Sequence, residues 1–418
     1  MRSVPWLGKK GREKGALLPY NVNYGKSTSA MSFERRKIEG ILRERFIDGN
    51  RVLLLHRGPE TFETIFKYLE KAADIVCLEF YIYRNDETGE RLAEILRRKA
   101  SEGVQVYVLY DHFGSFGTPR AFWRRLAEAG IKVRASRPFT WKDPANYIKR
   151  DHKKLIIIDG EVAFTGGLNI ANEYSGFHLL HHPVRLKGRN LYSWRDTGVL
   201  LKGPAAMALL EHFRKAWRLW SGEDVPYRKD PPFYPDGFPV IPIFASSARG
   251  RRRMRRLLYW SIENSRKAIN LTTAYFTPSL RMLSALKRAA SRGVRVRLLL
   301  PGRSDVMAAH YAARASFTKL LRYGVEIYTY SGTILHSKSY LFDDVWSVIG
   351  SANLDFQSLR KNDEGNVGIL DERFGSEMLR VFEDDIMMSE RVELDEWLKR
   401  PLCEKWKERF FAAFRKRL

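Results

Sequence analysis

Cysteine is nearly absent from this sequence. The 418 residues include only two cysteines, Cys77 and Cys403, which stand far apart. They offer neither a disulfide framework nor the paired spacing of a zinc site, so we expect a reducing compartment. Cys77 lies within an apolar run, which predicts a small buried hydrophobic side chain.

Long apolar runs are absent as well. No stretch reaches the roughly 18 to 20 apolar residues that a membrane-spanning helix needs. The segment from Met1 to Asn50 is basic and polar and has no apolar core of a secretory signal. We therefore expect a cytoplasmic protein, or one that lies on a membrane without crossing it.

Acidic residues are too few to balance the basic ones. The chain holds 73 lysines and arginines against 48 aspartates and glutamates, a formal charge of +25. A surface this basic attracts polyanions. Charge alone does not choose between nucleic acid and the anionic face of a membrane.

The sequence does contain an internal repeat. A helix, an apolar strand, a second helix, a Gly-Val pair and a second strand follow one another in Thr61–Asp111 and again in Arg255–Pro301. The repeat matches Tyr81 with Tyr275. Strands that alternate with helices of about 10 to 15 residues indicate βα units and a mainly parallel or mixed sheet.

A proline-dense segment separates the two copies. Six prolines fall within residues 222–242, a density that fits neither a helix nor a central strand. We therefore predict five parts: a basic N-terminal segment 1–45, a first domain 46–221, a linker 222–242, a second domain 243–395, and a basic amphipathic C-terminal helix 396–418.

Each copy carries the same motif, H-x-K-x4-D-x6-G-x2-N. The matching residues are His152, Lys154, Asp159, Gly166 and Asn169 in the first copy, and His336, Lys338, Asp343, Gly350 and Asn353 in the second. Residues two apart in a strand point to the same face, so each histidine and its lysine are predicted to project into one site. Two imidazoles suit phosphodiester chemistry, because one can attack phosphorus while the other protonates the leaving alcohol.

This paired motif resembles the phospholipase D superfamily, and the likeness runs from about Arg51 to Ile386. Flanking stretches are similar to bacterial cardiolipin synthases, particularly the form without N-terminal transmembrane helices. These stretches are Leu78–Tyr83, Phe164–Tyr174, Trp194–Thr197, Ala274–Pro278 and Gly350–Asp355. Two positions depart from the usual pattern: Gly198 replaces a histidine, and Gln357 replaces a frequent arginine.

The resemblance implies an α/β fold of two homologous phospholipase D-like domains. Each would be a mixed β-sheet flanked by helices, and a pseudo-two-fold axis would place the active site at their interface. His152 would be the nucleophile that forms a phosphohistidine, and His336 the general acid and then the base. The phosphoryl oxygens would be held by Lys154, Lys338, Asn169 and Asn353, with Ser351 as a further donor.

Carboxylates complete the implied site. Asp196 and Glu364 stand where a carboxylate downstream of each histidine is expected, so Asp196, or a neighbour, would pair with His152. Such a carboxylate fixes the tautomer of an imidazole and supports its cationic form. Asp159 and Asp343 belong to the catalytic motif, and we expect them to be structural supports rather than proton carriers.

The leading functional hypothesis is phosphatidyl transfer from one phosphatidylglycerol to another, which yields cardiolipin and glycerol without a metal or cofactor. The alternative enzyme is a phospholipase D-type hydrolase of lipid or nucleic-acid phosphodiesters. A non-catalytic lipid-binding scaffold is a third reading, and the retained motif residues speak against it.

Three other segments leave alternatives open. The histidines His178, His181 and His182 lack carboxylates at ligand spacing, so a loop at the pocket mouth is favoured over a metal site. The run Arg249–Arg256 fits a nucleic-acid patch or a lipid-facing helix start. The last segment repeats an apolar side chain every four residues among basic ones, at Leu402, Trp406, Phe410 and Phe414.

That last pattern is typical of a helix lying in a membrane interface, or of one packed on its own domain. We therefore expect anionic phospholipid and a membrane surface as partners, with nucleic acid disfavoured. The expected location is peripheral, on the cytoplasmic face of the cell membrane. The sequence does not indicate an oligomeric state.

Overall fold

The computed structural model describes residues 33–139, 141, 149–177, 184–186, 189–191, 193–227 and 229–415. The chain divides into two units, Met1–Met31 and Ser32–Leu418, and the described residues all belong to the second. Most of the predicted N-terminal segment 1–45 therefore lies outside the described residues. Within the described part, no helix combines the length and the apolar character needed to cross a membrane.

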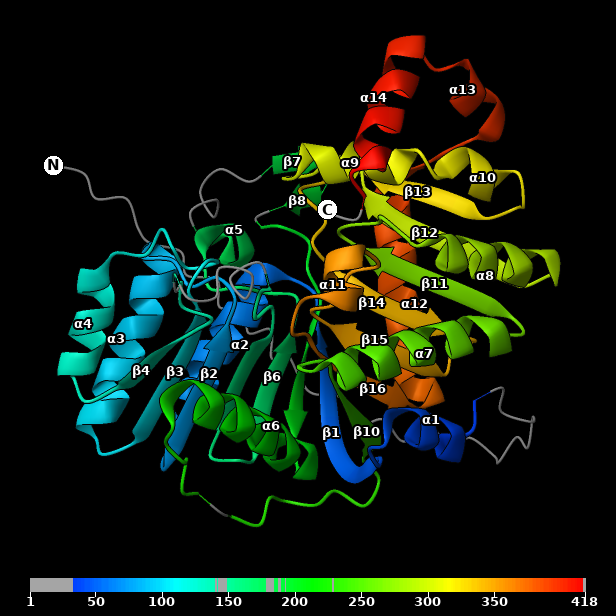
Figure 1. Ribbon diagram of the computed structural model, residues 1–418. Coiled ribbons are helices and arrows are strands. Elements are labelled where there is room, and N and C mark those ends of the chain that lie inside the picture. The colour runs from blue at the N-terminus through cyan, green and yellow to red at the C-terminus, as the bar shows by residue number, and fades with distance from the viewer. Residues whose placement is uncertain are drawn as a thin grey trace, which may run out of the picture. The chain divides into compact units, whose positions relative to one another are not determined.

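One sheet of 15 strands organises this unit (Figure 1). Its order is β17-β13-β12-β11-β14-β15-β16-β10-β1-β9-β6-β5-β2-β3-β4. The first-half strands are β1 (Ile47–Leu55), β2 (Ile75–Phe80), β3 (Gln105–Asp111), β4 (Lys132–Ser136), β5 (Lys154–Ile158), β6 (Val162–Gly166) and β9 (Gly198–Lys202). The second-half strands are β10 (Phe238–Phe244), β11 (Ala268–Thr273), β12 (Arg295–Pro301), β13 (Glu326–Tyr330), β14 (Lys338–Phe342), β15 (Trp346–Gly350), β16 (Gly365–Leu370) and β17 (Ser389–Arg391). A separate hairpin pairs β7 (Val184–Leu186) with β8 (Arg189–Leu191).

The two halves share one topology. The order β4-β3-β2-β5-β6-β9 is matched by β13-β12-β11-β14-β15-β16, with parallel and antiparallel pairings at the same places. The strands that lead into the halves, β1 and β10, pair antiparallel at the centre of the sheet. The predicted α/β fold of two homologous halves related by pseudo-two-fold symmetry is thereby confirmed.

Helices cover both faces of the sheet (Figure 1). The first half carries α2 (Gly58–Leu69), α3 (Glu87–Ser101), α4 (Arg120–Glu128), α5 (Asn172–Ser175) and α6 (Pro204–Ser221). The second half carries α7 (Ala248–Asn264), α8 (Leu280–Ser291), α9 (Met307–Arg314), α10 (Phe317–Leu321), α11 (Phe356–Arg360), α12 (Glu372–Met387), α13 (Leu394–Lys399) and α14 (Leu402–Ala413). A short α1 (Arg35–Leu42) precedes β1 and packs beside α7.

Strand alternation sorts the core into layers. In β5, Ile156 and Ile158 join the core under α2, α3 and α4, whereas Leu155 and Ile157 point to the opposite face. Successive side chains of a strand point to opposite faces. Because both faces of β5 are covered by core residues, all of residues 155–158 are apolar. The opposite-face core includes Cys77, which is fully buried as predicted, together with residues of α6, α12, β15 and β16. Both halves therefore share one apolar core.

The predicted linker was too long. Residues 238–242 belong to β10, a central strand between β16 and β1, although they include Pro239 and Pro242. Pro239 precedes the first β10–β16 pair, and Pro242 lies beyond the last β1–β10 pair, next to an irregular register. A missing N–H is tolerated where a neighbouring ladder is interrupted. The proline-dense segment correctly predicted a connection between the halves, but this connection ends before Phe238 and not at residue 242.

The motif aspartates stabilise a turn at the far end of each motif strand. The Asp159 carboxylate accepts hydrogen bonds from the backbone N–H groups of Ala73, Asp74 and Ile75 at 2.8 to 2.9 Å. Asp343 accepts in the same way from Arg266, Lys267 and Ala268. Both aspartates have a left-handed backbone, with φ of 52° and 51°. Although they belong to the catalytic motif, they hold the start of the neighbouring strand, β2 or β11, and lie at the opposite end of the motif strand from the histidines.

Replacing Asp159 by alanine is expected to lower the free energy of unfolding by about 2–4 kcal/mol, because three backbone donors lose a charged acceptor. Urea unfolding of the whole chain measures this loss. Asp159→Asn is the matched control, since it retains one acceptor oxygen and tolerates the left-handed backbone. Equal stability of the alanine variant and the wild type would contradict the assigned role.

Candidate active site

Each motif histidine is attached to the other half of the molecule. His152 precedes β5 by two residues, and its backbone N–H donates to the carbonyl of Asp363 at 2.8 Å. His336 precedes β14 by two residues, and its N–H donates to the carbonyl of Arg195 at 2.8 Å. Residues 151 and 363 form one parallel bridge, and residues 195 and 335 form its counterpart. The two halves are therefore joined at the two histidines.

These bridges determine which carboxylate faces each histidine. Nδ1 of His152 lies 3.0 Å from Oε2 of Glu364, and Nδ1 of His336 lies 2.7 Å from Oδ2 of Asp196. The expected pairing of Asp196 with His152 is therefore wrong: each carboxylate serves the histidine of the other half. The physical reason is the backbone bridge, because Glu364 follows Asp363 and Asp196 follows Arg195.

The carboxylates fix the tautomers. Oε2 of Glu364 accepts from the Ser351 hydroxyl as well, and Oδ2 of Asp196 is likewise an acceptor. Nδ1 of each histidine therefore carries the hydrogen and Nε2 keeps its lone pair. Nδ1 of His336 also lies 2.7 Å from Nζ of Lys338, but two donors cannot share that contact. We assign the hydrogen bond to Asp196, since Lys338 donates instead to the His336 carbonyl.

Burial controls the charge on both histidines. Their exposed fractions are 8% for His152 and 4% for His336. Burial, followed by the positive charges of Lys154 and Lys338, places the pKa of His152 well below its usual value. Burial and Lys338 also lower the pKa of His336, but Asp196 opposes this shift through its charge and its hydrogen bond. His336 is therefore the easier of the two to protonate.

The two motif lysines lie beside the histidines and are buried. Nζ of Lys154 donates to the His152 carbonyl at 2.7 Å. Burial lowers the pKa of Lys154 to about 7 and that of Lys338 to about 8, although Glu364 and Asp196 act in the opposite direction on both. The charges of both carboxylates, one from each half, act on each lysine. The two motifs therefore meet in one site, as the sequence predicted.

The asparagines have partners within the protein. Oδ1 of Asn169 accepts from the N–H of Ile82 at 3.2 Å, and its Nδ2 donates to the Tyr174 hydroxyl at 2.8 Å. Oδ1 of Asn353 accepts from the N–H of Tyr275 at 3.3 Å. Both asparagines thus hold the loop that follows a repeat strand, and a phosphoryl oxygen would compete with Tyr174 for Asn169.

Ser351 supports a carboxylate. Its hydroxyl donates to Oε2 of Glu364, and its oxygen accepts from the N–H of Gly365 at 3.1 Å. A phosphoryl oxygen would compete with Glu364 for this hydroxyl, and the role of Ser351 as a further donor to phosphate stays a prediction. Burial raises the pKa of Glu364 to about 8, and the Ser351 hydrogen bond moderates this shift.

Aromatic side chains line the histidines, and most of them were missed from the sequence. The Tyr81 ring lies edge-on to His152 with centroids 4.9 Å apart, and Tyr174 and Trp194 lie 5.2 and 5.8 Å from His336. Tyr275 lies 6.4 Å from His336. Tyr81 and Tyr275 occupy matching positions of the repeat, and this match could have pointed to these two aromatic residues from the sequence.

The buried charges beside the two histidines differ: Arg195, whose carbonyl holds His336, binds Asp385 at 2.7 Å, whereas a larger network surrounds Asp363. Nζ of Lys153 contacts Glu79 and lies 3.0 Å from Asp151. Asp363 binds Arg137 and, at 3.0 Å, Arg251. The position of Lys153 is occupied in the second half by a serine, Ser337. The network anchors Asp363, whose carbonyl holds His152, so the two half-sites are not equivalent.

Glycines allow Asp196 its position. Gly166 of β6 pairs with Gly198 of β9, and a Cβ on Gly166 would lie 2.4 Å from the Gly198 Cα. A Cβ on Gly167 would lie 2.0 Å from Oδ1 of Asp196. Gly198, where the family pattern has a histidine, therefore lies in a closely packed strand pair beside the site.

His178, His181 and His182 lie outside the described residues. Within the residues that are described, no group of three or more His, Cys, Asp or Glu side chains is arranged to hold a metal ion.

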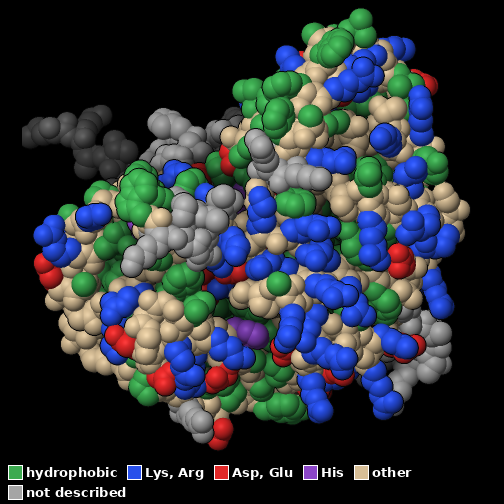
Figure 2. Space-filling view, viewed as in Figure 1, with side chains coloured by type: hydrophobic (Ala, Val, Ile, Leu, Met, Phe, Trp, Pro, Cys, Tyr) green, Lys and Arg blue, Asp and Glu red, His purple; other side chains and the backbone are tan. Residues whose placement is uncertain are grey.

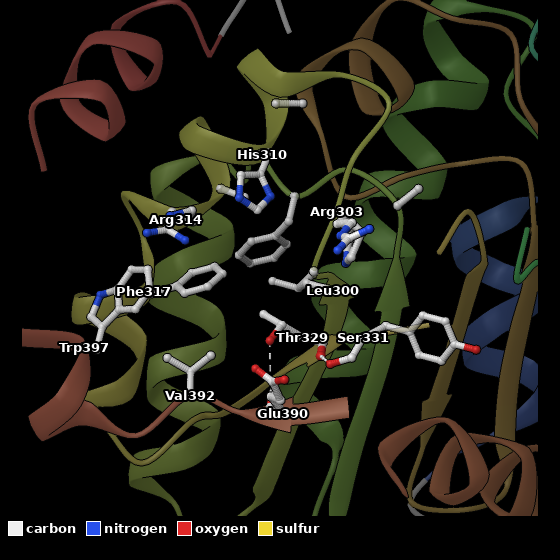
Figure 3. A pocket seen from close by; sticks show the side chains of 17 residues that line it. Leu300, Arg303, His310, Arg314, Phe317, Thr329, Ser331, Glu390, Val392 and Trp397 are labelled. Atoms are coloured by element: carbon white, nitrogen blue, oxygen red, sulfur yellow. Dashed lines mark hydrogen bonds between the residues drawn. The ribbon is translucent and has the colours of Figure 1, made fainter. Parts of the chain in front are cut away.

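A cavity of about 470 Å³ lies beside the second half-site (Figure 3). Its wall includes Phe276, which follows Tyr275, together with Phe317 and Trp397. Figure 3 shows Arg303, His310 and Arg314 along one side of this apolar wall. Arg314 also binds Glu404 and Glu408 of α14 at 3.4 and 3.1 Å, which connects the cavity wall to the C-terminal helix.

Comparisons with known proteins agree with this geometry. The family described as "Cardiolipin synthase, PLD-like domain" matches residues 65–178 and 258–386. Cardiolipin synthase A of Pseudomonas putida (strain GB-1) is 34% identical over 345 residues, 82% of this chain and 70% of that protein. Cardiolipin synthase of Geobacillus kaustophilus (strain HTA426) is 35% identical over 353 residues, 83% of this chain and 68% of that protein.

The fold has a solved counterpart. The crystal structure of phosphatidylserine synthase from Haemophilus influenzae Rd KW20 matches 91% of this chain and 97% of its own, with a TM-score of 0.66 and 14% identity. The duplicated fold and the paired motif define a member of the phospholipase D superfamily. Within it, the chain belongs to the cardiolipin synthase, PLD-like domain family, which confirms the resemblance seen in the sequence.

The lysine pKa values predict a pH dependence. Both ammonium groups are charged below their pKa and lose charge as the pH rises through about 7 and 8. The KM for an anionic phosphodiester should therefore rise roughly tenfold between pH 6 and pH 9, the effect of losing a charged hydrogen bond. Steady-state kinetics measure this profile.

Lys154→Arg separates the lysine effect from the other groups. Its guanidinium stays charged throughout this range, so the rise of KM with pH should be shallower than in the wild type, whatever happens to kcat. Parallel KM profiles in the two proteins would show that Lys154 does not bind the phosphodiester.

Proposed function

We propose that this phospholipid phosphatidyltransferase moves the phosphatidyl group of one phosphatidylglycerol to a hydroxyl of a second, forming cardiolipin and releasing glycerol. The observation that carries this proposal is the crossed arrangement of His152 with Glu364 and His336 with Asp196 around two buried lysines. Cardiolipin synthase is also the name of the relatives that match most of the chain.

In the first step, Nε2 of His152 attacks phosphorus and the bond from phosphorus to the glycerol headgroup oxygen breaks. Cationic His336 gives its Nε2 proton to that oxygen, so glycerol leaves and a phosphatidyl group remains on His152. The charge pattern supports this assignment. His152 is surrounded by cations that keep it neutral, whereas Asp196 supports the cationic form of His336.

In the second step, neutral His336 accepts a proton from a hydroxyl of the second phosphatidylglycerol. The resulting oxygen attacks phosphorus, and the phosphorus–nitrogen bond to His152 breaks. Cardiolipin forms, His152 regains its lone pair, and His336 is again cationic. Lys154 and Lys338 would balance the phosphoryl charge in both steps, and no metal is needed.

Burial of the site favours an alcohol over water as the acceptor. Both histidines are almost fully buried, and aromatic rings surround them. A site that excludes bulk water limits hydrolysis of the covalent intermediate. Hydrolysis, with phosphatidic acid as the product, is the outcome that the experiment below distinguishes.

The C-terminal helix supports membrane association. Leu402, Trp406, Phe410 and Phe414 are exposed by 72, 69, 61 and 41%. The other face of α14 is held to the protein, because buried Glu408 binds Arg314 and Arg400. The sequence allowed either a helix in a membrane interface or a helix packed on its own domain. Helix α14 combines the two, because one face is apolar and exposed and the other contacts the protein (Figures 1 and 2). We propose that the exposed stripe enters the headgroup region of the cytoplasmic membrane face.

The direct test incubates the purified chain with phosphatidylglycerol vesicles and a chelator, with His152→Ala as the matched protein. The wild type should form cardiolipin and glycerol in equal amounts, and the variant at least about 10³-fold less, since covalent catalysis is lost. Mass spectrometry of the lipids measures cardiolipin, and an enzymatic assay of the aqueous phase measures glycerol.

Each other outcome has a meaning. Phosphatidic acid without cardiolipin would replace transfer by hydrolysis. Cardiolipin formation by the variant at the wild-type rate would place the chemistry elsewhere. Circular dichroism of the variant separates a lost nucleophile from a lost fold.

A further inference from the structure

A second cleft, of about 950 Å³, lies on the second half of the molecule, outside the catalytic histidines. Residues of α7, the start of α8, α11 and the end of α14 line it. Six arginines line this arginine cleft: Arg252, Arg255, Arg256, Arg281, Arg360 and Arg415. Figure 2 shows lysine and arginine side chains gathered over this face of the second half.

The positive charge of the arginine cleft is not compensated. Within the described part of the chain, none of the six guanidinium groups forms an ion pair, whereas nearby Arg288 and Arg295 bind Glu263 and Glu326. Asp355 is the only carboxylate among the described residues that line the cleft, and it accepts from the N–H of Ser358 at 2.7 Å. Arg255 donates to the carbonyl of Leu359, which is a neutral acceptor. Like charges held together without ion-pair partners repel one another, so an anionic ligand would relieve this repulsion.

Local geometry holds several guanidinium groups in place. Arg252, Arg255, Arg256 and Tyr259 follow the spacing of one helix face. Arg281 lies 4.5 Å from the centroid of the Tyr259 ring, and Arg360 stacks similarly on Phe356 at 5.5 Å. A planar guanidinium offers paired N–H donors that match two oxygens of a phosphate. The site therefore suits a phosphate group more than a neutral polar ligand.

Apolar side chains beside the arginine cleft indicate where the phosphate comes from. Leu280 lines the cleft and is 60% exposed. Arg415 directly follows Phe414, the last member of the exposed apolar stripe of α14. Exposed apolar groups next to cations match the level of a bilayer where headgroup phosphates meet acyl chains. A free phosphate in water would make no use of them.

We propose that the arginine cleft binds the phosphate of an anionic phospholipid headgroup in the membrane, at a site separate from the catalytic one. The bound lipid anchors the second half on the bilayer while α14 inserts its apolar stripe. This inference concerns binding and does not require the reaction proposed above. It also favours the lipid-facing interpretation of the arginine run over the nucleic-acid patch.

The experiment compares two double variants of the full chain on the same helix. Arg252→Gln/Arg256→Gln removes two cleft charges, and Arg249→Gln/Arg253→Gln removes two charges of α7 that do not line the cleft. Co-sedimentation is measured with vesicles of phosphatidylcholine containing 30 mol% phosphatidylglycerol. Parallel vesicles carry oleate at the same zeta potential, and isothermal titration with inorganic phosphate tests the free ion.

The cleft variant should bind phosphatidylglycerol vesicles about 20- to 30-fold more weakly than the wild type, since each basic residue near the surface contributes roughly fivefold. The control variant should lose less than about threefold. The wild type should prefer phosphatidylglycerol over oleate vesicles, because the cleft recognises phosphate and not charge alone. Thermal unfolding midpoints confirm that both variants are folded.

Three results would overturn the proposal. Equal losses in the two double variants would reduce the cleft to a general basic surface. Undiminished binding of the cleft variant would remove it from the interface. Binding of inorganic phosphate with no vesicle binding by the wild type would assign the cleft to a soluble anion. None of these readings depends on cardiolipin formation.

Discussion

The hydrogen bond from each motif histidine to a carboxylate of the opposite half is the interaction on which this site depends. His152 with Glu364 and His336 with Asp196 join the halves at the point where the chemistry is proposed. Neither half alone has a complete pair of histidine and carboxylate. The duplication therefore produces one site from two copies, and the backbone bridges beside the histidines hold its geometry.

The rest of the fold holds these two pairs in position. The central β1–β10 pair and the apolar core shared by α6 and α12 prevent the halves from shifting relative to each other. The motif aspartates tie each histidine-bearing strand to the strand beside it. Burial then lowers the pKa of both histidines and both lysines, so that a neutral nucleophile and a titratable pair of cations occupy the same site.

The sequence predicted the repeated features and failed where the two halves meet. Strand alternation and the doubled motif led to the mixed sheet, the buried Cys77 and the convergence of histidines and lysines, because these follow from local periodicity and spacing. The partner of His152 could not be predicted, since it depends on a bridge between residues 151 and 363. The hydrogen bond from Ser351 to Glu364 could not be predicted either, because the motif does not show that these side chains meet in space. Pro239 and Pro242 concealed a central strand, because the strand pairing that tolerates them depends on the tertiary fold.

The central claim, one shared site with His152 as nucleophile, is tested most directly by covalent trapping. A phosphatidyl ester of p-nitrophenol needs no acid for departure of its leaving group, so the first step should proceed in His336→Ala while the second step lacks its base. Intact-protein and peptide mass spectrometry should then find one phosphatidyl group per chain, on His152. A label on His336 in His152→Ala would reverse the assignment of roles, and half of the wild-type turnover in each single variant would contradict a shared site.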